Sequence, residues 1–243
     1  MIKRLFIFIM LAMMAFMFFK LGASYQERDH LGKLGHYYAE TGPSELNTPN
    51  LVTAVVVTYR GLDTLGEVTV LFISAAGVGL LLRRTRKGAD EDEDEDNDES
   101  AVIHRPASEI VETATQLLLP MVMLFGVYVF INGHLSPGGG FQGGAIIASG
   151  TMFLLLALPE SHISRLLISL MESLSGFGYV VVGVLGVILA GGFLDNRIMD
   201  TGVYGDLFSA GAIPIIYVFI GLKVGFELSA VLDRFRREQD GAG

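Results

Sequence analysis

The stretch Gly176-Phe-Gly-Tyr-Val-Val-Val-Gly-Val-Leu-Gly-Val-Ile-Leu-Ala-Gly-Gly-Phe-Leu194 contains no charged residue. A bilayer core about 30 Å thick requires about 20 mostly apolar residues in helical conformation, so this stretch predicts a membrane-spanning helix. In the rest of the chain, the same criterion predicts five further spans, at residues 4–22, 65–82, 114–132, 142–158 and 207–231. We therefore expect an all-α, polytopic integral membrane protein with six transmembrane helices.

The composition of the whole chain agrees with this class. Of its 243 residues, 51% are hydrophobic and only 18% are charged, and the mean hydropathy is +0.51. There is no cysteine, which excludes disulfides, iron–sulfur clusters, Cys-ligated zinc and thiol nucleophiles within the chain. The histidines lack zinc spacing, and neither a hydrolytic constellation nor a basic patch for nucleic acid is present. We expect no cofactor or metal in this chain, no catalysis by the chain alone and no nucleic-acid partner.

The first apolar segment admits two interpretations. Lys3 and Arg4 precede the apolar run, as in a signal peptide. Leu21, however, is a poor residue for the position three before a cleavage after Ala23. We therefore keep the segment as a span.

The basic residues predict the orientation, because Lys and Arg near the ends of spans remain cytoplasmic. With both termini inside, the cytoplasmic side holds eleven of the 17 basic residues. These are Lys3, Arg4, Arg83, Arg84, Arg86, Lys87, Arg105, Arg165, Arg234, Arg236 and Arg237. An even number of spans with both termini in the cytoplasm is therefore expected.

The net charge of −9 comes from one tract, because residues 90–99 hold nine acids. Such a block repels itself and buries no apolar surface, so it predicts a solvated cytoplasmic linker. A calcium site is the weaker interpretation, since the tract lacks the glycine turn of a calcium loop. The predicted organisation is a two-span module at residues 1–88, a linker at 89–104 and a four-span module at 105–243.

Three charged residues lie around the start of the second span. Arg60, Asp63 and Glu67 have the spacing i, i+3 and i+7, which places them on one helix face. A charge at membrane depth usually faces protein or water rather than lipid. One interpretation is an interfacial Arg–Asp pair, with Glu67 reaching the headgroups. The other is a polar station on an ion or proton path.

The sixth span contains a second charged pair. Lys223 and Glu227 are four residues apart, hence stacked on one helix face. Pro214 is expected to remove a backbone hydrogen bond one turn before Tyr217. The pair either offsets its own desolvation or serves as a proton relay, because burial lowers the affinity of a lysine for its proton while each charge holds the other.

Between the third and fourth spans lies a glycine-rich connection from Asn132 to Gly144. Its glycines permit left-handed turns and close backbone approach. It lacks the Gly-Lys-Ser/Thr ending of a phosphate-binding loop. His134 within it can titrate near neutral pH, although such a histidine is more often a hydrogen-bonding residue. Small residues in the fourth and fifth spans predict a surface for partner helices.

This connection carries a family resemblance. Phe130-Ile-Asn-Gly-His-Leu-Ser-Pro-Gly-Gly-Gly-Phe-Gln-Gly-Gly144 resembles the hallmark of the B-type component of Mrp/Mnh-type multisubunit cation/proton antiporters. The same family includes the corresponding component of membrane-bound hydrogenases. The resemblance extends over residues 105–235 and implies a four-span subunit.

The second span carries another resemblance. Tyr59-Arg-Gly-Leu-Asp-Thr-Leu-Gly-Glu-Val-Thr-Val-Leu71 is similar to the tail of the large A-type Mrp component, which in membrane-bound hydrogenases is a separate, small E-type component. The usual pattern begins Asp-Phe-Arg-Gly-Phe-Asp, whereas Thr58 and Tyr59 replace its first two residues here. One acidic group is therefore missing. The resemblance implies a fusion of E-like and B-like components.

Together the resemblances imply an accessory membrane subunit of a sodium/proton (cation/proton) antiporter in the cell membrane of a prokaryote. Its partners would be other Mrp- or hydrogenase-type membrane subunits, membrane lipid, sodium ions and protons. The candidate ion-path residues are Arg60, Asp63, Glu67, His134, Lys223 and Glu227. Two alternatives remain open: residence in a hydrogenase or other ferredoxin-linked respiratory complex, and a purely structural scaffold.

Overall fold

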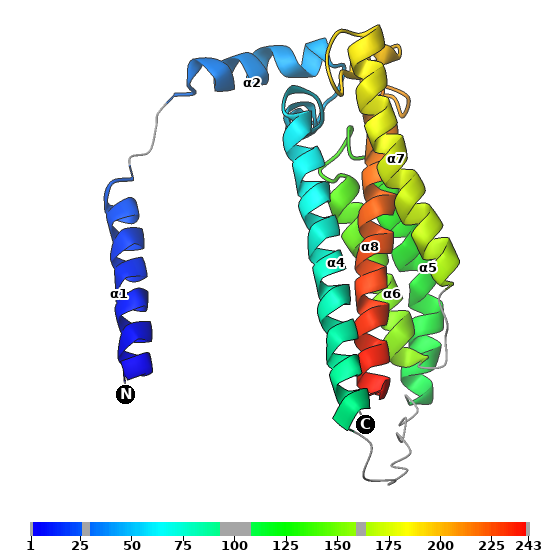
Figure 1. Cartoon of the computed structure of the whole chain (residues 1–243). Coiled ribbons are helices and arrows are strands. Elements are labelled where there is room, and N and C mark those ends of the chain that lie inside the picture. Colours follow the sequence, from blue (N-terminus) through cyan, green and yellow to red (C-terminus); the bar gives the residue numbers. More distant parts are fainter. Residues whose placement is uncertain (1, 26–29, 93–107, 159–163, 242–243) are drawn as a thin grey trace. The chain divides into compact units, whose positions relative to one another are not determined.

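The computed structural model describes residues 2–25, 30–92, 108–158 and 164–241. The regular elements in these ranges are all helices, which confirms the all-α class (Figure 1). The long helices are α1 (Ile2–Ala23), α4 (Gly61–Asp92), α5 (Glu109–Ile131), α6 (Gly140–Ala157), α7 (Arg165–Leu189) and α8 (Ile213–Gly241). The shorter elements are α2 (Lys33–Glu45), α3 (Leu51–Thr53), the π-helix η1 (Ala54–Tyr59) and the 3-10 helix η2 (Asn196–Ile198).

Six of these helices are long and apolar enough to cross a membrane, as predicted, so the chain is a multi-pass membrane protein. The predicted fifth span, 176–194, is displaced, because the apolar helix runs over Leu166–Leu189. Ser164 caps its N-terminus by accepting a hydrogen bond from the amide of Leu167. Its C-terminus is set by Gly191, whose φ of +84° breaks the helix.

The sixth span also begins later than predicted, at Ile213 rather than residue 207. Ala210 and Gly211 have φ values of +65° and +58°, which no helix accommodates. The expected loss of a hydrogen bond at Pro214 is wrong. Pro214 is the second residue of α8, where the amide groups have no partner within a helix in any case.

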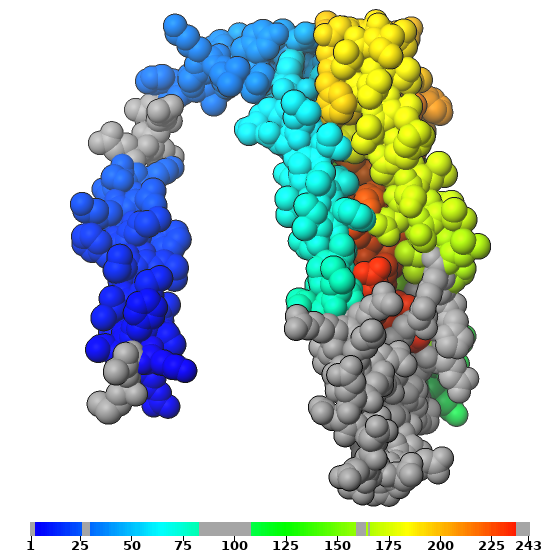
Figure 2. All heavy atoms as spheres, viewed as in Figure 1, coloured from blue at the N-terminus to red at the C-terminus, as the bar shows by residue number. Residues whose placement is uncertain are grey.

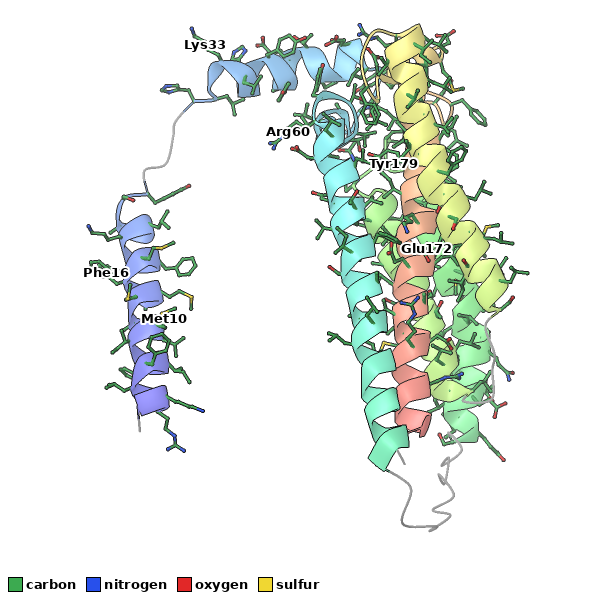
Figure 3. All side chains as sticks on the ribbon, viewed as in Figure 1. Met10, Phe16, Lys33, Arg60, Glu172 and Tyr179 are labelled. Carbon is green, nitrogen blue, oxygen red and sulfur yellow. The ribbon has the colours of Figure 1, made fainter. Side chains whose placement is uncertain are left out.

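The chain forms two compact units, residues 1–37 and 38–243. In the first unit, α1 carries apolar side chains on all sides, among them Met10 and Phe16, and they are exposed (Figure 3). A helix that is apolar all round is suited to lipid or to the helices of other subunits.

In the second unit, α8 lies at the centre and contacts α4, α5, α6 and α7 (Figure 1). Half of the apolar part of α8 is buried within the chain. Ile213, Ile216, Ile220 and Val224 recur at helical spacing and form a buried stripe, which packs against Tyr179 of α7. The central helix therefore meets every other span of this unit.

Glycines let α6 approach its neighbours closely. A Cβ atom at Gly144 would lie 2.8 Å from the carbonyl oxygen of Gly221 on α8, and one at Gly143 would lie 2.6 Å from that of Gly126 on α5. In α7, Gly178 lies against Phe219 of α8 in the same way. The predicted surface for partner helices is therefore wrong for Gly143, Gly144 and Gly178, which pack the chain's own helices together.

The long connections gather at one end of this unit. The side-chain amide of Asn47 donates to the carbonyl of Thr201 at 3.1 Å, and that of Asn50 donates to the carbonyl of Gly133 at 2.7 Å. At the other end, α4 continues to Asp92, so the first residues of the acidic tract are helical. The remainder of the predicted linker, from residue 93, lies outside the described residues.

Candidate functional site

Two of the three charged residues predicted to share a helix face form an ion pair. Nη2 of Arg60 lies 2.5 Å from Oδ2 of Asp63, and both side chains are more than half exposed. Arg60 ends η1, with φ −125° and ψ 32°, so it precedes the first turn of α4. Glu67 is exposed one turn beyond Asp63 and forms no ion pair with the described residues. Arg60 and Asp63 thus form an ion pair that does not include Glu67.

Glu67 lies near the boundary between α4 and α7. At this boundary Tyr179 of α7, which is 2% exposed, belongs to the same core cluster as Val68 of α4. The hydroxyl of Tyr179 donates to the carbonyl of Gly61 at 3.3 Å and so holds the start of α4 against α7. Glu67 is also within the apolar helix Gly61–Leu82, at membrane depth. The position is costly for a carboxylate that faces lipid.

Lys223 and Glu227, the pair predicted on the sixth span, are in contact. Nζ of Lys223 lies 3.1 Å from Oε2 of Glu227, and the side chain of Glu227 is 2% exposed. Oε1 of Glu227 has no hydrogen-bond partner among the described residues. The predicted pair is therefore buried, and Oε2 of Glu227, although close to Nζ of Lys223, likewise has no hydrogen-bond partner among the described residues.

A third charged residue, Glu172 of α7, completes this cluster and was not among the predicted site residues. Its Oε1 accepts a hydrogen bond of 2.9 Å from Nζ of Lys223. The prediction missed it because the fifth span was placed to begin at residue 176. The sequence did contain a signal, since Glu172 is the only charged residue within Leu166–Leu189.

The ring of Phe72 supplies the fourth side of the cluster. Nζ of Lys223 lies 4.7 Å from the centroid of this ring on α4. An ammonium group at this distance is attracted by the negative face of an aromatic ring. Lys223 therefore interacts with groups from α4, α7 and α8 at once, and it links the two predicted modules.

At the end of the unit where α4 begins, Asn50 clamps the glycine-rich connection. Its side chain caps α3 by accepting from the amides of Val52 and Thr53, and it donates to the carbonyls of Gly133 and Ser136. These bonds join the two predicted modules through residues that lie outside the six apolar helices. Gly139, with φ +152° and ψ −180°, supplies the one backbone conformation in this connection that requires glycine.

His134 lies inside this connection and is fully buried. Its carbonyl accepts a hydrogen bond of 2.6 Å from the hydroxyl of Thr48, and its Nε2 lies 3.4 Å from the carbonyl of Asp206. Burial lowers the pKa of His134 below 6.5, while hydrogen bonds to backbone carbonyls oppose this shift. The neutral, hydrogen-bonding state is therefore favoured, and the structure does not bring His134 into the Lys223 cluster.

At the opposite end, Arg234 ties α8 to α4. Its Nη1 donates to the carbonyl of Ala75 at 3.1 Å, and its side chain fills the space over Gly79. Asp233 and Arg236 approach each other at 3.7 Å on the same helix. Within residues 2–25, 30–92, 108–158 and 164–241, no group of three or more His, Asp or Glu side chains is placed to hold a metal ion.

Two family models match different parts of the chain. Residues 4–97 match the MbhE family, the E component of MBH, and residues 110–230 match the domain related to the MnhB subunit of the Na+/H+ antiporter. The B component of the Na(+)/H(+) antiporter of Bacillus subtilis is 38% identical over 78 residues, which are 32% of this chain and 54% of that protein. This chain thus matches about half the length of that relative.

Two solved structures are similar over nearly the whole chain. One is a chain of the membrane-bound sulfane sulfur reductase (MBS), an archaeal respiratory membrane complex, with 38% identity, a TM-score of 0.77 and coverage of 97% of this chain and 98% of that chain. The other belongs to the Mrp complex from Dietzia sp. DQ12-45-1b, with 23% identity, a TM-score of 0.71 and coverage of 96% and 26%; it shows the fold alone. The chain therefore belongs to the family of MnhB-related antiporter subunits, and an MbhE-type segment precedes the MnhB-related domain in the same polypeptide.

Proposed function

We propose that this chain is an accessory membrane subunit of a multisubunit cation/proton antiporter module, in which it contributes to ion translocation and to assembly. The match to the MnhB-related domain and the likeness to the B component of a Na(+)/H(+) antiporter support this function. The exchanged ions are sodium and protons. The MbhE-like segment at residues 1–88 and the MnhB-like module at 105–243 act as one subunit, joined by the acidic linker at 89–104.

The observation that carries this proposal is the position of Glu67. It lies on the exposed side of an apolar helix, at membrane depth, with no ion pair among the described residues. A carboxylate cannot remain ionised against lipid without a large cost. Glu67 is therefore covered by another membrane subunit or by a water-filled path, and Asp63, one turn away, extends the same polar face.

The subunit resides in the cell membrane of a prokaryote, surrounded by lipid and by other subunits of the Mrp or hydrogenase type. Both termini face the cytoplasm, because the ends of α4 and α8 and the start of α7 then place their arginines inside. Arg60 holds Asp63 in place. His134 serves the packing of the glycine-rich connection on the outer side rather than the ion path.

The substitution Glu67→Gln tests the proposal, since it keeps the shape of the side chain and removes its exchangeable charge. Cation/proton exchange is measured in inverted vesicles, and the content of complex is checked on a native gel. We expect normal assembly and exchange at least about tenfold slower, which corresponds to about 1.4 kcal/mol. Normal exchange in a fully assembled variant would remove Glu67 from the ion path. Impaired assembly would favour the scaffold alternative.

A second candidate function is supported by the similarity to a chain of the MBS complex, which extends over nearly the whole length of both chains. In this version the same subunit operates within a redox-driven respiratory complex. Affinity purification of the intact complex discriminates the two, because nickel–iron or iron–sulfur subunits copurify only in the second case. Metal analysis of the purified complex gives the readout.

A further inference from the structure

Two carboxylates share one ammonium group near the midpoint of the apolar helix Ile213–Arg236. Nζ of Lys223 lies 2.9 Å from Oε1 of Glu172 and 3.1 Å from Oε2 of Glu227. The side chains of Lys223 and Glu227 are 9% and 2% exposed. If all three groups were ionised, the cluster would carry one uncompensated negative charge in a region from which water is largely excluded, which is strongly unfavourable.

Lys223 is not the group that loses its charge. Its ammonium has an anionic partner on each side and the face of the Phe72 ring at 4.7 Å, so all three of its surroundings favour the charged form. Deprotonation would leave two buried carboxylates without a cation. The excess charge must therefore be neutralised on a carboxylate.

Glu227 is the carboxylate suited to carry this proton. Its contact with Lys223 is an ion pair without hydrogen-bond geometry, and its Oε1 has no hydrogen-bond partner among the described residues. Glu172, in contrast, accepts a hydrogen bond of 2.9 Å from Nζ of Lys223, which compensates part of its charge. The hydrogen bond from Lys223 therefore compensates a negative charge on Glu172 better than the contact with Lys223 compensates one on Glu227.

The surrounding helices carry few charged or titratable side chains that could compensate the negative charge of the cluster. Between Val68 and Leu82, α4 has no titratable side chain, and α6 has none along its length. The acids of α5 lie in its first turn, and Tyr128 is exposed. Arg234 lies two turns further along α8, about 10 Å by helical rise, and donates to the carbonyl of Ala75.

We propose that the Glu172–Lys223–Glu227 cluster binds one exchangeable proton, held by the carboxyl group of Glu227. The proposal deepens the proposed function, on which it rests for the physiological role of the site. The ligand is a proton rather than sodium, because the ammonium of Lys223 already occupies the position between the two carboxylates. No group of three or more acidic or imidazole side chains is placed to coordinate a metal in the part of the chain that the structure describes.

The cluster has an approach from the side of the bundle. Figure 2 shows a strip of α8 left uncovered between α4 and α7. Glu172 and Phe72 come from the two helices that border this strip, and Glu227 lies beneath, on α8. Glu172 is the most exposed of the three charged side chains, at 20%, against 9% for Lys223 and 2% for Glu227. Glu172 is thus a positioning residue, because its charge creates the demand for the proton.

The test is infrared difference spectroscopy of the purified, intact complex during a pH titration, with the carboxylic-acid carbonyl band as the readout. We expect a protonated carboxyl group at neutral pH in the wild type and its loss in Glu227→Gln. Glu172→Gln should also lose the band, although Glu227 is intact, because the ammonium then balances one carboxylate. The exposed residue Glu109 provides the matched control, and Glu109→Gln should retain the band.

Three outcomes would overturn the proposal: a band that persists in assembled Glu227→Gln, a band unaffected by Glu172→Gln, or a band abolished by sodium at constant pH. The three glutamine variants each replace a carboxylate with an uncharged side chain of the same shape, and the assembly of every variant is checked on a native gel. Lys223→Met supplies a further check, since removal of the ammonium should preserve the band. The infrared band does not depend on transport. The proposal on the Glu172–Lys223–Glu227 cluster can therefore hold when the Glu67→Gln experiment contradicts the proposed function, and it can fail when that experiment supports the proposed function.

Discussion

The hydroxyl of Thr53 lies 2.8 Å from the phenolic oxygen of Tyr217 and donates to the carbonyl of Gly133, also at 2.8 Å. Because the proton of Thr53 is used at Gly133, Tyr217 donates to Thr53. Thr53 precedes α4, Gly133 lies in the glycine-rich connection, and Tyr217 is in α8, so one buried chain of hydrogen bonds joins the MbhE-like segment to the MnhB-like domain.

Tyr217→Phe should lower the free energy of unfolding by about 1 kcal/mol, since it removes one hydrogen bond and leaves Thr53 bonded to Gly133. Thr53→Val should cost more, about 1–3 kcal/mol, because it leaves the buried hydroxyl of Tyr217 without a partner and reduces the carbonyl of Gly133 to its bond from Asn50. Thermal unfolding of the detergent-purified protein measures both. Tyr128→Phe, at a side chain that is 56% exposed, is the control and should unfold as the wild type does.

Gly144→Ala should destabilise the contact between α6 and α8. The added Cβ atom would lie 2.8 Å from the carbonyl oxygen of Gly221 and 2.9 Å from the amide nitrogen of Gly225, both of which are backbone atoms that cannot rotate away. The helices must separate, at a cost of about 1–3 kcal/mol. Gly77→Ala is the matched control, because nothing lies within 4 Å of its Cβ position. Equal melting temperatures for the two variants would contradict the close packing.

The topology can be tested with single cysteines, since the natural chain has none. The exposed positions Tyr37 and Val203 are suitable sites on the side opposite the predicted linker. We expect a membrane-impermeant maleimide to label Tyr37→Cys and Val203→Cys in intact cells and to spare Glu95→Cys. Labelling at position 95 from outside would exclude the arrangement with both termini in the cytoplasm.

His134 should make stability depend on pH on the acidic side. Its pKa in the folded state is below 6.5, so above pH 6.5 the residue is neutral in both states and its contribution is complete. Below pH 6.5 His134 binds a proton in the unfolded chain but not in the folded chain. The free energy of unfolding therefore decreases as the pH is lowered. His134→Gln should flatten this decline in melting temperature, whereas His36→Gln, at an exposed histidine, should not. Parallel declines in the wild type and His134→Gln would contradict the assignment.

Much of the membrane architecture follows from local sequence. Uninterrupted apolar length fixes where a helix can cross a bilayer, and this alone predicted six spans, all of which are present. The ends were predicted less well, because they depend on single residues: the cap at Ser164, and the left-handed backbone at Ala210 and Gly211. These residues act through their conformation rather than their hydropathy.

The contacts of the small residues could be predicted only in part. Their spacing indicated close helix packing, but it could not say which helix each glycine meets. Gly143 and Gly144 lie side by side in the sequence, yet one faces α5 and the other faces α8. The partner of each glycine follows from the placement of the helices, which no local pattern encodes.

The candidate site divides in the same way. The contact between Lys223 and Glu227 could be predicted without a structure, because residues four apart stack on a helix whatever surrounds them. The packing of the bundle was needed to bring Glu172 to the same ammonium group, from 51 residues away in the sequence, and to place Phe72 over it. The balance of two carboxylates against one ammonium, and hence the demand for a proton, depends on distances across three helices. Helical periodicity determines contacts within a helix, whereas contacts between helices depend on how their side chains pack together.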